Sequence, residues 1–385
     1  MSTSVVDVPN VRVTVPVIAL TLYAVASGYL MSIIPLMLPF YGLDTELAGW
    51  LASLFYAGLL IGAVAIEPVI RQIGHKNAFV WCLLTLILTI IALPSMPNAF
   101  AWLASRFVAG LAVAGIFVVV ESWLLSGDEQ ARTKRLGVYM AALYGGTSIG
   151  QFGIGFIGVS GAIPFITMIT FLLFAVMVLL VGRGQQPNHH QSHRLSLKSV
   201  TKANQAALIG CVVSGLTLGA IYGLMPLALS QQHIEHQHIG SLMALIILGA
   251  MAVQPVVPWL SKVFGSTLLM GGFCLIGSAA SITALLSTSL IEMSISLFVL
   301  GISIFALYPI AINLGCKAVS ADQIVTITQV MLLSYSVGSV VGPVLADISM
   351  QSQHGLFGYL FAMLFSTCLY MMVVSIKRHK RAMAG

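Results

Sequence analysis

The sequence predicts an all-α membrane protein whose twelve transmembrane helices form two pseudo-symmetric six-helix halves. Three observations predict this fold class: an apolar composition, an alternation of basic and non-basic connections, and a repeat of glycines. Of the 385 residues, 58% are hydrophobic and 7% are charged, against about 25% charged in a soluble domain. This composition excludes a soluble enzyme, a disordered protein and a coiled coil. It also excludes a membrane β-barrel, whose strands alternate polar and apolar residues.

Apolar stretches long enough to cross a bilayer, which takes about 20 residues, follow one another along the chain. The polar stretch 182–204 is predicted to be a cytoplasmic linker between an N-terminal half (1–181) and a C-terminal half (205–385). No cleavable signal is expected, because the first span is too long for the apolar region of a signal peptide. The predicted spans are 14–38, 47–70, 78–95, 99–125, 136–158, 162–181, 205–229, 239–259, 267–286, 290–314, 324–347 and 355–376.

The basic residues predict the orientation. Sixteen of the 17 Lys and Arg residues lie in the terminal tails or in connections that follow even-numbered spans. The exception, Arg106, lies inside the fourth span. Because cytoplasmic connections are enriched in Lys and Arg, this alternation predicts that both termini are cytoplasmic.

Glycines recur at one spacing in the two halves. Gly74 and Gly110 are each followed 191 residues later by another glycine, at Gly265 and Gly301. The Gly146–Gly150 pair recurs 192 residues later as Gly338 and Gly342. Six spans is an even number, so the halves are predicted to have the same orientation and to be related by an axis along the membrane normal.

Five short segments carry a family resemblance: Leu103–Gly110, Val118–Ser122, Tyr222–Leu227, Leu307–Pro309 and Leu333–Pro343. They resemble the major facilitator superfamily, and in particular its YcaD-type branch of bacterial inner-membrane proteins. The resemblance runs from the second to the eleventh span. It implies the major facilitator fold, a multi-pass protein of the bacterial inner membrane, and secondary transport in which two rocking halves expose a central site to one side at a time. It does not identify the solute.

The chain departs from the superfamily pattern at two places. After the second span, Arg71 stands where the superfamily has its gating Asp, and Lys262 repeats this change after the eighth span. The usual gate therefore cannot be assumed. The Gly-Pro pair of many antiporters is absent from the fifth span and is found in the eleventh, at Gly342-Pro343. The gating candidates are Glu67, Arg71, Gly74, Lys262 and Gly265, and the four-residue spacing of Glu67 and Arg71 favours an ion pair.

Arg106 and Glu121 are the candidates for solute transport and proton coupling. A charge inside a span is costly and marks a functional site by default. Arg106 could hold an anionic group in the cavity, or its head group could simply reach the membrane interface. Glu121 is about 22 Å further along the same helix. It could carry a proton, since burial disfavours a charged carboxylate, or it could pair with Arg71, Arg132 or Arg135.

Other residues are candidates for helix packing and for the cavity wall. Spacings of small residues allow close helix approach at Gly110, Gly146, Gly150, Gly338 and Gly342, and Pro343 is expected to bend its helix. Each polar cavity candidate could instead hydrogen-bond between helices without meeting a solute. The cavity candidates are Tyr23, Tyr56, Tyr144, Gln151, Tyr222, Gln254, Tyr308, Asn313, Gln329 and Tyr335, together with Ser27 and Thr217.

No cofactor, metal site or nucleic-acid partner is predicted. The histidines at 189, 190 and 193 and at 233, 236 and 238 have no recognised ligand spacing, the five cysteines form no CxxC motif, and no ATP-binding phosphate loop occurs. The expected partners are a small organic solute, protons and the lipid bilayer, and the protein is expected to be a monomer.

The favoured function is proton-linked export of an amphipathic compound, because the cavity is predicted to combine aromatic side chains with few charges. One alternative is a facilitator or proton symporter that imports a small metabolite, and solute flux under an imposed pH gradient separates the two. A lipid-handling protein or a membrane-embedded enzyme is a further alternative. An enzyme would need convergent catalytic groups, and no nucleophile–base pair can be assigned.

Overall fold

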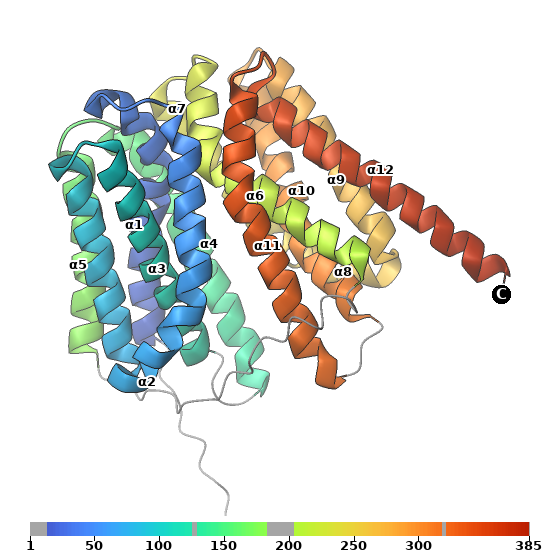
Figure 1. The fold of residues 1–385 in the computed structure, drawn as a ribbon, viewed down its shortest axis with the longest axis horizontal. Helices are drawn as coiled ribbons and strands as arrows, with labels where there is room; N and C mark the ends of the chain where they lie inside the picture. Colours follow the sequence, from blue (N-terminus) through green and yellow to red (C-terminus); the bar gives the residue numbers. More distant parts are fainter. Residues whose placement is uncertain (1–13, 125–128, 183–203, 318–320, 385) are drawn as a thin grey trace, which may run out of the picture.

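The computed structural model describes residues 14–124, 129–182, 204–317 and 321–384, and in these ranges the chain is almost entirely helical (Figure 1). A short 3₁₀ helix, η1 (Leu38–Tyr41), follows the first helix. The helices of the N-terminal half are α1 (Thr14–Met37), α2 (Leu47–Ser95), α3 (Ala99–Leu124), α4 (Glu129–Ile157) and α5 (Ile163–Val181). Those of the C-terminal half are α6 (Gln205–Gln231), α7 (His236–Val253), α8 (Val256–Val263), α9 (Ser266–Leu286), α10 (Leu290–Cys316), α11 (Ala321–Met350) and α12 (Gly355–Ala384).

These helices make the twelve predicted crossings. The 49 residues of α2 would extend about 74 Å, more than twice the thickness of a hydrocarbon core, so α2 crosses twice. Its two crossings meet at Gly74, whose φ of 80° and ψ of 163° are not helical. Together, α7 and the short α8 form the eighth crossing. Ten helices of the described residues are long and apolar enough to span a membrane.

The structure differs from the predicted spans in four places, one of which is the end of α12, eight residues past the predicted end at 376. The connection expected between the second and third spans is a break at the single residue Gly74. The eighth span is interrupted after Val253, where Pro255 has no N–H to continue the helix. Helix α4 begins at Glu129, seven residues before the predicted start, because a charged first turn at the membrane surface is helical without being apolar. The rest of α4 packs between α1 and α7.

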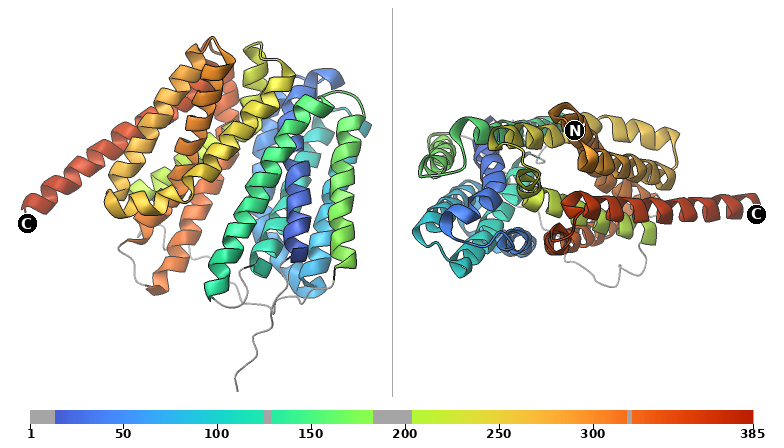
Figure 2. Two further views of the ribbon diagram at one scale, coloured as in Figure 1. Left: turned by 180° about the vertical axis from the view of Figure 1, so that it is seen from behind. Right: turned by 90° about the horizontal axis from the view of Figure 1, so that it is seen from above.

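The two halves lie side by side, with blue to green helices on one side and yellow to red helices on the other (Figure 2). Helix contacts within one half recur in the other half at the same sequence spacing as the glycines. A methyl group at Gly110 would collide with the carbonyl of Phe55, and one at Gly301 with the carbonyl of Ile246, which again lies 191 residues after Phe55. Equivalent helix contacts therefore stabilise the interior of each half. The boundaries of the halves remain a prediction, and most of the predicted linker 182–204 lies outside the described residues.

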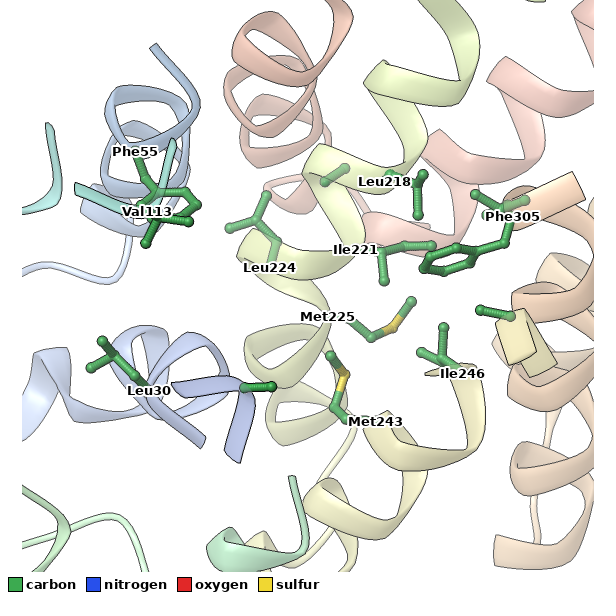
Figure 3. Close-up of a cluster of buried hydrophobic side chains, with 14 of the residues drawn as sticks. Leu30, Phe55, Val113, Leu218, Ile221, Leu224, Met225, Met243, Ile246 and Phe305 are labelled. Atoms are coloured by element: carbon green, nitrogen blue, oxygen red, sulfur yellow. The ribbon is translucent and has the colours of Figure 1, made fainter. Parts of the chain in front are cut away.

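Buried apolar side chains fill the interior of each half and the contact between them. In the C-terminal half, Ile221 and Met225 of α6 meet Met243 and Ile246 of α7 and Phe305 of α10 (Figure 3). Leu224 leaves α6 on its other side, where α6 packs against α1 and α2. Helix α6 thus links the core of its own half to the N-terminal half.

Candidate functional site

Arg106 of α3 lies in the interior of the protein, with 7% of its surface exposed. Its guanidinium carbon is 4.3 Å from the centre of the Phe55 ring of α2. Close packing of the two helices produces this contact, because Gly110 and Gly58 each leave no room for a side chain against the opposite backbone. Tyr23 and Tyr56 lie within electrostatic range of the guanidinium.

The charge of Arg106 is only partly compensated. Its Nε atom has no hydrogen-bond partner among the residues that the structure describes. Placing an Arg at membrane depth costs about 3 kcal/mol on insertion scales. A desolvated cation–π contact such as that with Phe55 stabilises the buried guanidinium by roughly 2 kcal/mol. Among the residues that the structure describes, the phenols near the guanidinium contribute dipoles and no full negative charge.

A pocket opens beside Arg106, between the two halves. The empty space among its lining atoms, including space that is open to solvent, is about 280 Å³. The lining is largely apolar, with one cation and two phenols. Its residues are Met31, Ile34 and Pro35 of α1, Ala52, Phe55 and Tyr56 of α2, Arg106 of α3, and Tyr222 and Gly223 of α6.

Aromatic side chains continue between the halves. The ring of Phe305 is 6.0 Å from Tyr144 of the N-terminal half and 6.1 Å from Tyr222 of its own half, both edge-to-face. Tyr308 and Tyr335 are 5.0 Å apart. All four tyrosines are half-buried, and together with Phe305 they form an aromatic wall.

The halves are in close contact on one side of this pocket, through α2, α6 and α11. The Ser53 hydroxyl donates to the carbonyl of Val340 at 2.5 Å. A methyl group on Gly223 would collide with the Cβ of Ala52, and one on Gly49 would lie 2.6 Å from the Cβ of Asp347. Nearer the helix ends, Gln351 donates to Glu46 at 3.3 Å. We call this set of contacts the seal.

A second contact between the halves joins α4 to α7. Gly240 of α7 packs against the carbonyl of Gln151. The Gln151 side chain is fully buried and accepts a hydrogen bond from Ser32 of α1 at 2.5 Å. Gln151, predicted as a cavity residue, therefore lies in the packing of α4 against α1 and α7, outside the pocket lining. Thr217 likewise bonds to the carbonyls of its own helix.

Glu121 lies on the same helix as Arg106 but toward the other end, where its side chain is exposed. It accepts a hydrogen bond from the Tyr139 hydroxyl of α4 at 3.0 Å. Tyr308 of the C-terminal half is within electrostatic range of it, so the carboxylate faces the space between the halves. Of the basic partners predicted for Glu121, Arg71 pairs with Glu67, and the side chain of Arg132 lies outside the described residues.

The gating candidates lie at the Gly74 end of the bundle, opposite the seal. Arg71 forms the predicted ion pair with Glu67, at 2.5 Å within α2. Lys76, which follows the Gly74 break, donates to the carbonyls of Leu180 and Gly182 at 3.1 and 3.2 Å and so caps the end of α5. Lys262 is exposed in the last turn of α8. Gly265 follows in ordinary extended backbone with φ of −61°.

The polar residues of the pocket lining are candidates from the sequence, whereas its apolar residues are not. Arg106, Tyr56 and Tyr222 line it as predicted candidates, and Tyr23 adjoins it. Gln254, Asn313 and Gln329 are half-buried outside its lining. Phe55, Ala52 and Gly223 carry no polar signal and were not predicted. The described residues contain no group of three side chains able to hold a metal ion.

A twelve-crossing bundle of two similar halves, with a mixed aromatic and cationic pocket between them, is the architecture of a membrane transporter. The family model of the Major Facilitator Superfamily matches residues 17–343. The chain belongs to this superfamily. Its family is therefore one of multi-pass membrane transporters and not a family of enzymes.

Known relatives and solved structures agree with this assignment. The chain is 32% identical over 363 residues to the MFS-type transporter YcaD of Escherichia fergusonii, covering 93% of both chains. It is 34% identical over 340 residues to YcaD of Escherichia coli O6:K15:H31, covering 86% of this chain and 87% of the relative.

Among solved structures, the nucleoside transporter NupG superposes with a TM-score of 0.71 at 12% identity, covering 94% of this chain and 96% of NupG. A bacterial homologue of the human lysosomal transporter Spinster, in an inward-facing unoccupied conformation, gives 0.70 at 16% identity, covering 94% of this chain and 93% of the homologue. At 12% and 16% identity, these two structures support a shared fold and nothing further.

Proposed function

We propose that the protein is a secondary active transporter that moves a small organic solute across the bacterial inner membrane by alternating access. In this proposal it exports an amphipathic compound in a proton-linked cycle. The observation that carries the proposal is the pocket beside Arg106: it lies between the halves, directly beneath the seal. A site with one closed side is what alternating access requires.

The orientation in this proposal follows from the basic residues. Connections after even-numbered spans share one end of the bundle, and Arg71, Lys76 and Lys262 lie there. This end is assigned to the cytoplasm, together with both termini. The seal then closes the periplasmic side, and the conformation is inward-facing. The ribbons of the two halves approach each other near the seal and diverge toward the basic end, in support of this assignment (Figure 1).

In the proposed cycle, solute enters from the cytoplasm, passes the aromatic wall and binds in the pocket. Binding draws α1, α2 and α3 toward α6 on the cytoplasmic side. The halves then rock as bodies, because their internal helix contacts are rigid, and the seal parts between Ala52 and Gly223. The solute leaves to the periplasm from the same pocket.

Glu121 is the proposed proton carrier. Its carboxylate faces the space between the halves on the cytoplasmic side, and the Tyr139 hydroxyl fixes its position. When the cytoplasmic side closes, the carboxylate is transferred from water to a confined space beside Tyr308. Charged carboxylates are disfavoured there, so proton binding and closure are coupled.

Proteoliposome flux tests the proton linkage. The purified protein is reconstituted with radiolabelled benzenesulfonate or benzyltrimethylammonium as permanently charged aromatic probes, and ΔpH is imposed in either direction. We expect flux of at least one probe to change with the sign of ΔpH, and Glu121→Gln to lose this dependence. Glu235→Gln, an exposed carboxyl at the opposite end, is the control and should behave as wild type.

Flux that ignores ΔpH, or normal coupling in Glu121→Gln, would contradict the proton-linked proposal and leave a facilitator. Uptake that is fastest when protons flow inward with the solute would instead identify the importing symporter. Molecular mass in detergent, measured by light scattering, checks the expected monomer.

A further inference from the structure

We infer that the pocket beside Arg106 is an organic-anion site: it takes a solute with one negative group on a small apolar or aromatic body. This inference rests on the proposed transport function and specifies its substrate class. The first observation is that Arg106 is 93% buried and lines the pocket. Its Nε atom has no partner among the residues that the structure describes.

Within the described parts of the chain, the surroundings of Arg106 provide polarisable groups but no counter-ion. The Phe55 ring faces the guanidinium, and Tyr23 and Tyr56 are its electrostatic neighbours. Glu121, the other charge of α3, is about 22 Å away along the helix and cannot neutralise it. A buried charge without a hydrogen-bonded partner is unfavourable. An incoming carboxylate or sulfonate would supply that partner, and charge-assisted bonds to guanidinium are among the strongest available.

The rest of the pocket selects the body of the solute. Met31, Ile34 and Pro35 supply apolar side chains to the lining, and Tyr56 and Tyr222 supply phenol side chains. A cation would be repelled by Arg106, and a neutral solute would displace water from the guanidinium without replacing its charge interaction.

The charge distribution along the transport path supports the same class. The cytoplasmic end carries the basic residues together with about half of the acids, whereas Asp44, Glu46, Glu235, Glu292 and Asp347 lie at the end that includes the seal, in connections without Lys or Arg. An anion is therefore attracted at the open end and repelled at the sealed end, which agrees with loading from the cytoplasm.

The experiment compares four probes that share one ring: benzoate, benzenesulfonate, benzamide and benzylamine. Their binding to the purified full-length protein is measured by thermal shift and by calorimetry, in wild type, Arg106→Gln and Arg106→Lys. We expect both anions to stabilise the wild type, and the amide and amine to have no effect. Loss of the charge-assisted bonds should weaken anion binding about tenfold or more in Arg106→Gln. Arg106→Lys should retain part of it.

Three outcomes would overturn the inference: no anion binds the wild type, the amide or amine binds as well as the anions, or Arg106→Gln binds the anions as tightly as wild type. If Arg106→Gln does not fold, the comparison of the four probes on the wild type still tests whether the pocket prefers anions. Flux of benzyltrimethylammonium without anion binding would reject the anion site and leave the proposed transporter intact. Absence of flux with every probe, despite anion binding in the pocket, would reject transport and retain the site.

Discussion

Gly74 and Gly265 occupy matching positions in the two halves, yet their backbones place different demands on the residue. Gly74 has φ of 80° and ψ of 163°, a conformation that is essentially restricted to glycine. Gly265 has φ of −61°, and a methyl group there would meet nothing within 4 Å. At Gly74 the chain reverses in one residue, which positions Lys76 to cap α5.

Gly74→Ala is expected to destabilise the protein by about 1–3 kcal/mol, the cost of holding an L-residue in this backbone region. Gly265→Ala is the matched control and should change stability by less than about 0.5 kcal/mol. The midpoint of unfolding of each purified variant in the same detergent gives the comparison. Equal effects of the two variants would show that the Gly74 conformation relaxes without cost.

The residue scale also shows where prediction from sequence ends. Arg106 could be found because charge is rare in an apolar chain, and Tyr56 and Tyr222 because hydroxyls in spans are few. Phe55 could not, since its role depends on which face of α2 meets α3. Gln151 was a reasonable cavity candidate by polarity, but its amide bonds to Ser32 in the contact between helices.

At the scale of elements, close glycine contacts set the distance between neighbouring helices. Gly150 lets α4 approach the backbone of α1 at Val25, and Gly342 does the same for α11 against α6 at Leu216. These contacts lie within each half. The glycine faces of the fifth and eleventh crossings therefore hold each half rigid, as rocking of whole halves requires.

Gly150→Ala should separate α4 from α1, because its methyl group would overlap the Val25 carbonyl and neither backbone can move alone. Overpacking of this kind costs about 1–3 kcal/mol. Gly145→Ala, on the same helix but in open space, is the control and should be neutral or stabilising by up to about 1 kcal/mol. Unfolding midpoints measure both variants, and a neutral Gly150→Ala would refute this account of the α1–α4 contact.

Sequence patterns located the elements well but not their interruptions. Hydropathy and the alternation of basic residues predicted all twelve crossings, because lipid imposes length and charge rules on every span. The break after Val253 and the one-residue reversal at Gly74 were not predicted. Both depend on local backbone geometry, to which a window of about 20 residues is insensitive.

For the whole molecule, the repeat along the sequence predicted two halves of equal orientation. It could not predict their relative tilt, since inward- and outward-facing states share the same contacts within each half. Only contacts between halves differ from state to state. In the conformation described here these contacts include Ser53 with Val340, Ala52 with Gly223 and Glu46 with Gln351.

Gly223→Val is expected to open the seal, because its side chain would collide with Ala52 while α6 keeps its contacts within the C-terminal half. A penalty of about 3 kcal/mol against the sealed state shifts its population ratio by more than a hundredfold. Cross-linking reports this shift. With Glu46→Cys and Gln351→Cys introduced together, a short bifunctional thiosulfonate reagent should link the two thiols readily in the parent protein and at least tenfold more slowly with Gly223→Val.

Gly272→Ala, which lies in open space on α9, is the control and should leave the cross-linking rate unchanged. The cross-linked parent should also lose probe flux and regain it on reduction, because a fixed seal prevents release to the periplasm. If the Gly223→Val variant folds and its seal cross-links at the parent rate, Ala52 and Gly223 do not control closure. Closure would then depend on the second contact between the halves, where Gly240 of α7 packs against α4.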